Sequence, residues 1–198
     1  MIKIAATIMV MILLVAPVMA DHCSSDHGKE DATTAAAPAM PEMGVPEQLK
    51  NLAFLIGEWT YEGEMQMAPT DTAWIKHTAD AKWSYECEGA IIRYDFVGDM
   101  MPGMPTMTGL GLMAYDRGAK EWVQTWSDNF MAGLSRYTGQ FKDGEIAMTG
   151  VDNMGGMMVT TRVTTFDIED NTFKWKMEHS MDEGKTWWLS MKGVYTKK

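Results

Sequence analysis

Hydrophobic and polar residues alternate along most of the chain after Gly57. Between residues 59 and 67 every second residue is apolar or glycine, and a second alternation runs from Ile75 to Cys87. A period of two places successive side chains on opposite faces, as in a β-strand with one buried face. The pattern predicts about ten short strands. They are expected near 59–67, 75–87, 90–98, 107–116, 120–128, 130–140, 145–151, 157–168, 171–180 and 186–196.

Short turn sequences rich in Gly, Asp and Asn separate these strands. They lie at residues 88–89, 116–120, 142–144, 169–171 and 182–184. No gap between the strands is long enough for a crossover helix, so consecutive strands are expected to run antiparallel. Closure of such a sheet removes its exposed edges. We therefore predict an all-β, antiparallel up-and-down β-barrel of about ten strands.

The segment before the first strand has a helical pattern. Pro46 suits a first helical turn, and Gly57 is a helix-ending residue. The apolar residues between them, Leu49, Leu52, Phe54 and Leu55, form one face. We predict a single short N-terminal helix.

The first 45 residues differ from the rest in composition. Lys3, an apolar run at 8–15 and a small-x-small exit at 18–20 predict a signal peptide at 1–20, with cleavage after Ala20. The apolar run is shorter than the roughly 20 residues of a membrane span, and no second run exists, so no span is predicted in the mature protein. Residues 21–45 lack apolar content and predict a disordered linker, which leaves 46–198 as the barrel domain. The protein is expected to be exported, either to the periplasm or out of the cell.

The net charge and the cysteine content bear on the expected binding partners and on a possible disulfide. The formal net charge is −10, and an acidic surface repels phosphate backbones, so nucleic acid is not expected as a partner. Cys23 and Cys87 are the only cysteines. Export to an oxidising compartment permits a disulfide between them, but Cys23 lies in the predicted linker, which leaves their pairing open.

Three stretches resemble a known bacterial family. They are LAFLIGEWTYEGE at 52–64, TGLGLMAYDRGAKEWVQTWSDN at 108–129 and MKGVYTK at 191–197. They are similar to domain-of-unknown-function family 1579, whose members are exported or lipid-anchored. The resemblance implies a lipocalin-like (calycin) β-barrel, related at a distance to the haem-binding nitrobindin barrels. It implies no activity. PGMPTM at 102–107 resembles a loop of this family that precedes the glycine-rich strand.

A barrel of this kind suggests a binding protein for a small apolar molecule. Aromatic residues and a few polar ones fall at positions where the alternation turns them toward the interior. The predicted ligand-binding residues are Trp59, Tyr61, His77, Trp83, Arg93, Trp126, Asp128, Arg136 and Trp175. Arg162 is placed inside by the same pattern, and Arg–Asp pairs there would either stabilise the fold or orient a ligand.

No resident cofactor is predicted. An inward His77 or His179 would be a candidate haem ligand, but the nitrobindin-like relatives carry that ligand in a His-Leu motif on a terminal strand. The last predicted strand here contains no histidine, so haem is not favoured.

An alternative function is soft-metal binding. Copper(I) and silver(I) favour thioether ligands, and two clusters of methionine occur at 101–107 and 154–158. Their members are Met101, Met104, Met107, Met154, Met157 and Met158. Because methionine also occupies strand positions throughout the chain, an adaptable apolar loop over the barrel mouth explains these clusters more simply.

Residues 180–187, SMDEGKTW, match the Asp-box pattern of a stable hairpin turn. Asp182 is expected to accept backbone hydrogen bonds there and Gly184 to take a positive φ. No serine-nucleophile motif, phosphate-binding loop or His-Glu-x-x-His motif occurs. The sequence therefore favours binding over catalysis.

Overall fold

The computed structural model describes residues 42–131 and 133–198. The predicted signal peptide at 1–20 and nearly all of the predicted linker at 21–45 lie outside these residues, and so does Cys23 of the Cys23–Cys87 pair. Cys87 itself is exposed.

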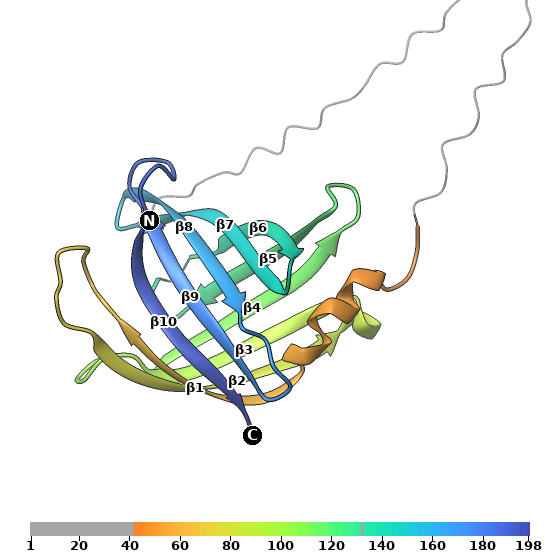
Figure 1. Cartoon of the computed structure of the whole chain (residues 1–198), viewed down its shortest axis with the longest axis horizontal. Coiled ribbons are helices and arrows are strands. Elements are labelled where there is room, and N and C mark those ends of the chain that lie inside the picture. Colours follow the sequence, from red (N-terminus) through yellow and green to blue (C-terminus); the bar gives the residue numbers. More distant parts are fainter. Residues whose placement is uncertain (1–41, 132) are drawn as a thin grey trace, which may run out of the picture. The chain divides into compact units, whose positions relative to one another are not determined.

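The described part contains ten β-strands and two short 3₁₀ helices (Figure 1). The helices are η1 (Glu47–Leu55) and η2 (Cys87–Gly89). The strands are β1 (Gly57–Met65), β2 (Ile75–Glu86), β3 (Ile91–Asp99), β4 (Met107–Asp116), β5 (Glu121–Asp128), β6 (Ser135–Lys142), β7 (Glu145–Met154), β8 (Met157–Phe166), β9 (Thr172–Ser180) and β10 (Trp188–Lys197).

The strands form one closed barrel. Each strand pairs antiparallel with its neighbours in sequence, and β10 pairs with β1. In that closing pair Tyr61 lies opposite Tyr195. Closure satisfies the backbone groups of both end strands, which would otherwise be exposed edges. The predicted all-β, up-and-down barrel is confirmed.

The predicted helix is the 3₁₀ helix η1, and Pro46 lies just before it. Leu49, Leu52 and Leu55 are its buried residues. A spacing of three places them on one face, because a 3₁₀ helix has three residues per turn. That face covers one end of the barrel, and the indole N–H of Trp59 in β1 donates to the carbonyl of Leu55 at 2.7 Å. Burial of these leucines and this hydrogen bond join η1 to the barrel.

The half of the barrel next to η1 is filled with aromatic rings. Trp83 stacks on Tyr94 with ring centroids 4.4 Å apart, and Phe173 stacks on Tyr195 at 4.6 Å. The hydroxyls of Tyr94 and Tyr195 are hydrogen-bonded at 2.9 Å. Stacked and edge-on aromatic pairs stabilise a core beyond their buried area, so this half is a packed core.

Among the described residues, none of the helices has the length and apolar character to span a membrane.

Candidate functional site

The two ends of the barrel differ in how they are covered. The η1 helix lies over the end where β1 begins (Figure 1). At the opposite end the strands are joined by the loops β1–β2, β3–β4, β5–β6, β7–β8 and β9–β10, and no helix of the described chain covers them. We call the half of the interior next to these loops the open half.

Three residues of the predicted ligand set belong to the packed core rather than to the open half. Trp59, Tyr61 and Trp83 are 0%, 1% and 5% exposed. Trp59 lies edge-on to Trp83 at 6.2 Å and to Phe173 at 4.8 Å. These rings form the floor below the open half.

Tyr61 reaches from this floor toward the open half. Its hydroxyl lies 2.3 Å from the place that a Cβ of residue 63 would occupy, so the ring extends over Gly63. The hydroxyl is buried and has no hydrogen-bond partner among the described residues. Burial raises the pKa of Tyr61, with a smaller contribution from Tyr195, so this hydroxyl is a neutral donor.

His77 of β2 lies beside Tyr61, with ring centroids 5.3 Å apart. It is 4% exposed, and within the described chain its Nε2 has no hydrogen-bond partner. Its Nδ1 lies 3.5 Å from the carbonyl of Ile75. Burial lowers the pKa of His77, against a smaller opposing effect of that carbonyl. The neutral imidazole of His77, with one ring nitrogen that lacks a hydrogen-bond partner, therefore lies beside a tyrosine whose hydroxyl also lacks one.

Trp126, Asp128 and Trp175 face the interior and are only half-buried. Trp126 and Asp128 share a face of β5 with the buried Trp122. The Trp126 indole N–H donates to Asp128 at 2.7 Å. The other oxygen of Asp128 accepts from the backbone N–H groups of Phe130 and Met131. These two bonds form a turn, which explains why β6 begins at Ser135 and not near 130 as predicted.

Of a polar wall on β6 to β10, only the inward position of His179 was predicted. The Tyr137 hydroxyl donates to the buried Asp152 at 2.9 Å, and Thr161 lies 3.1 Å from Nδ1 of the buried His179. Trp188, opposite His179 in the sheet, has a buried indole N–H without a hydrogen-bond partner in the described part of the chain. The signal for Asp152 was present, because it continues the alternation of Ile146 and Met148.

The predicted inward orientation of three arginines is wrong. Arg93, Arg136 and Arg162 alternate with buried or inward residues and lie on the outer face. Arg93 pairs there with Asp95 at 2.7 Å, and Arg136 is exposed. Burial of an unpaired guanidinium in an apolar core costs free energy, because the group loses its hydration. The outer face is therefore favoured for these arginines.

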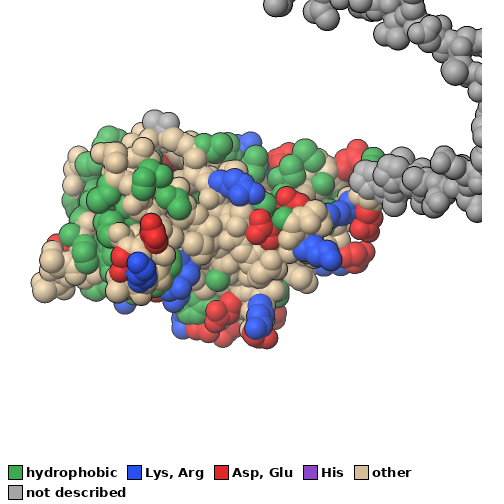
Figure 2. Space-filling model, turned by 90° about the horizontal axis from the view of Figure 1, so that it is seen from above, with side chains coloured by type: hydrophobic (Ala, Val, Ile, Leu, Met, Phe, Trp, Pro, Cys, Tyr) green, Lys and Arg blue, Asp and Glu red, His purple; other side chains and the backbone are tan. Residues whose placement is uncertain are grey.

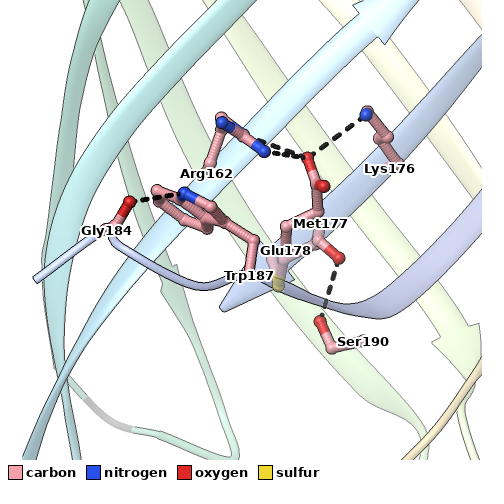
Figure 3. Close-up of polar contacts among 7 residues, drawn as sticks. All are labelled: Arg162, Lys176, Met177, Glu178, Gly184, Trp187 and Ser190. Carbon is pink, nitrogen blue, oxygen red and sulfur yellow. Dashed lines mark hydrogen bonds and ion pairs between the residues drawn. The ribbon is translucent and has the colours of Figure 1, made fainter. Parts of the chain in front are cut away.

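Arg162 has its partners on the outer face (Figure 3). Glu178 accepts from Arg162 at 3.0 Å and pairs with Lys176 at 3.2 Å. Partial burial alone would raise the pKa of Glu178, but the hydrogen bonds from Arg162 and Lys176 outweigh it and lower this pKa. The guanidinium of Arg162 lies 4.2 Å from the ring centroid of Trp187. This cluster stabilises the sheet and does not reach the interior.

The Asp-box loop holds Trp187 in that position. Asp182 accepts from the backbone N–H of Thr186 at 2.8 Å and from the hydroxyls of Thr186 and Ser180 at 2.7 Å each. These bonds lower the pKa of Asp182 to about 2. Gly184 has φ of +87° and its carbonyl accepts from the Trp187 indole. The loop forms as the sequence predicted.

The six methionines of the metal alternative divide into two groups. Met101 and Met104 lie in the β3–β4 loop and Met107 begins β4, whereas Met154, Met157 and Met158 lie around the β7–β8 turn. Strands β5 and β6 separate the two hairpins. Met101 and Met104 line a groove of ≈ 420 Å³ beside Lys76, His77, Thr78 and Asp99. Copper(I) binding stays a prediction that a copper(I) titration would test.

These features define the class: a lipocalin-like β-barrel, covered at one end by a helix and bordered at the other by the loops between its strands. The sequence profile described as "Protein of unknown function (DUF1579)" matches residues 46–197. The chain belongs to this family, as the three sequence stretches indicated. No curated protein sequence matches it significantly.

Two solved structures have a similar fold. One is Rv2717c from M. tuberculosis, which has 11% sequence identity and a TM-score of 0.56 and covers 78% of this chain and 99% of its own. The other is the S-type phycobiliprotein lyase CPES from Guillardia theta, at 9% identity and a TM-score of 0.52, covering 77% of this chain and 91% of its own. At these identities the similarity concerns the fold alone.

Proposed function

We propose that this protein is a non-enzymatic binding protein that holds a small, mostly apolar molecule in the open half of its barrel. The observation that carries the proposal is the pair of vacant polar atoms, the Tyr61 hydroxyl and Nε2 of His77. A buried polar group without a partner costs about 1–3 kcal/mol. A ligand that hydrogen-bonds to this pair would recover part of that cost.

The apolar surroundings of this pair support the same proposal. Trp126 and Trp175 face the interior yet remain half-buried, which means that the core does not enclose either residue completely. Ligand sites are concave, mainly apolar and furnished with a few oriented polar groups, and barrel mouths commonly provide them. The open half offers the apolar side chains and the oriented polar groups of such a site.

Binding of the neutral apolar dye Nile red tests the proposal. We expect saturable one-to-one binding, with energy transfer from tryptophan to the dye. Gln124→Trp adds a bulky ring on the inward face of β5, whereas Thr125→Trp adds it at the next residue on the outer face. The inward variant should weaken dye binding about tenfold or more, and the outward variant should leave it unchanged. An absence of saturable binding to the wild type would overturn the proposal.

Tyr61→Phe provides a second test. Because the hydroxyl makes no hydrogen bond in the described protein, its removal should leave the free energy of unfolding unchanged or slightly higher. Native mass spectrometry of the freshly purified protein should detect a co-purified small molecule, and the variant should retain less of it. Tyr115→Phe, at the end near η1, is the matched control.

We also propose that the protein acts outside the cytoplasm, on the basis of the sequence of residues 1–20. Cell fractionation combined with N-terminal sequencing should place the protein in the periplasm or the medium, with a mature chain that begins near residue 21. Recovery of the uncleaved chain in the cytoplasm would contradict this.

A further inference from the structure

The open half contains carboxyl groups on its inner wall. Asp128 uses both oxygens: one accepts from the Trp126 indole, and the other holds the turn after β5. Asp152 is 8% exposed, and the Tyr137 hydroxyl is its one side-chain donor within the described residues. A hydroxyl donates one hydrogen bond, whereas a carboxylate accepts about four. Most of the accepting capacity of Asp152 therefore remains unused.

No basic side chain faces these carboxyl groups from the described strands. Strand alternation places the arginines and nearly all lysines of the sheet on the outer face. Lys197 has the inward phase, but it lies at the opposite end, over the ring of Trp59. Burial lowers the pKa of both His77 and His179, and at His179 it outweighs the opposing effect of Asp152, so neither histidine supplies a counter-charge at neutral pH. A buried negative charge without a counter-ion is costly.

Buried polar atoms without hydrogen-bond partners and aromatic rings also occupy inward positions. The Tyr61 hydroxyl lies on β1 and His77 Nε2 on β2, and both residues are more than nine-tenths buried. Trp188 lies on β10, packed against His179 with ring centroids 5.5 Å apart. Tryptophan faces attract organic cations through the ring quadrupole. Carboxylate and tryptophan together are therefore complementary to a cation with an organic body.

The lining around this polar wall is rich in methionine. Inward-facing methionines are half-buried at Met65, Met107, Met154, Met177 and Met191. The loops and strand ends at the open end add exposed ones at Met67, Met104, Met131, Met157 and Met181. Figure 2 shows hydrophobic side chains gathered at the left end of the barrel, whereas charged ones are more frequent at the end near η1. Thioether side chains adapt to ligands of varied shape.

We propose that the ligand of the open half is a small organic cation with an apolar body, a protonated amine or a quaternary ammonium compound, whose charged group binds at Asp152. This inference rests on the proposed ligand-binding function and specifies its chemistry. The apolar body lies among the methionines, and the Tyr61–His77 pair offers hydrogen bonds deeper in the barrel. An anionic ligand is disfavoured, because the inward faces of the described strands in the open half carry two carboxyl groups and no lysine or arginine.

Three probes with the same alkyl chain test this inference: decyltrimethylammonium, decanol and decyl sulfate. The two ionic probes are titrated below their critical micelle concentrations and decanol below its solubility limit, and binding is followed by tryptophan fluorescence. We expect the cation to bind at least about tenfold more tightly than decanol, and decyl sulfate to bind most weakly. Added salt should weaken the binding of the cation and not that of decanol.

Asp152→Asn removes the charge and keeps an acceptor for Tyr137. It should lower the affinity for the cation about tenfold and leave decanol unchanged. Asp95→Asn, on the outer face, is the matched control and should change neither. Should Asp152→Asn not fold, the ranking of the probes on the wild type decides alone.

Equal or tighter binding of decanol or decyl sulfate would overturn the inference while leaving the proposed function intact. Unchanged affinity of Asp152→Asn for the cation would overturn the assignment to Asp152. Failure of all three probes together with Nile red would instead remove the proposed function itself.

Discussion

The ring of Tyr61 occupies the space that a side chain at residue 193 would need. A Cβ added to Gly193 would lie 2.4 Å from Cε2 of Tyr61 and 2.6 Å from the carbonyl oxygen of Glu62. Gly193 of β10 lies opposite Gly63 of β1, and a Cβ there would meet the Tyr61 hydroxyl at 2.3 Å. The closing strand pair is thus built around one tyrosine that lies flat over two glycines.

Gly193→Ala should destabilise the barrel by about 1–3 kcal/mol, because both the ring of Tyr61 and the β1 backbone would have to shift. Chemical denaturation followed by tryptophan fluorescence measures this. Gly133→Ala is the control: a Cβ there meets only the carbonyl oxygen of Met131 at 3.8 Å, so a change within about 0.5 kcal/mol is expected. Equal stability of the two variants would contradict the packing described.

Trp59→Phe should weaken the attachment of η1 to the barrel. The variant loses the hydrogen bond to the Leu55 carbonyl and leaves that buried acceptor unpaired, in addition to the loss of volume. Trp122 is similarly buried at 1% exposure, and its indole makes no hydrogen bond in the described part of the protein. We expect Trp59→Phe to be less stable than Trp122→Phe by about 1–2 kcal/mol in urea unfolding. Proteolysis should also cut the Trp59→Phe variant sooner near 47–55.

The stability of the barrel should fall as the pH decreases from 7 to 5. Burial lowers the pKa of His77 and of His179 in the folded protein, so below about pH 6.5 the unfolded chain takes up protons that the folded one does not. Each histidine contributes at most about 1.4 kcal/mol per pH unit. The variant His77→Gln/His179→Gln should show a smaller slope in thermal unfolding over this range. An identical slope would show that other groups cause the dependence.

Asp182 should affect the stability of the barrel in a lower pH range than the two histidines. Its folded pKa of about 2 lies below the usual aspartate value, so its stabilising effect is present above about pH 4 and is lost as the pH falls toward 2. Asp182→Asn should lower the melting temperature at pH 6, and the difference from the wild type should shrink between pH 4 and pH 2. A constant difference would indicate that the hydrogen bonds of Asp182 do not depend on its charge. Glu183→Gln in the same loop is the control.

The positions of the strands could be predicted from the sequence, but the predicted inward orientation of three arginines was wrong. Arg136 alternates with Tyr137 and Phe141, and Arg162 with Val159 and Val163, so the phase of the apolar residues already excluded both from the interior. Arg93 is different, because both phases of β3 contain apolar residues. There only the neighbouring strands show which face is inward.

The sequence by itself determined that the chain forms a barrel of short antiparallel strands with one helix, because alternation and turn residues are local properties. It also indicated the family and the Asp-box turn, which are contained in short stretches. Only the tertiary structure decided that β1 meets β10, that Asp152 and His179 share a wall, and that the Tyr61 hydroxyl and His77 Nε2 lack partners. The reason is physical. Whether a polar atom finds a hydrogen-bond partner depends on groups that are distant in the chain, and barrel closure alone brings those groups together.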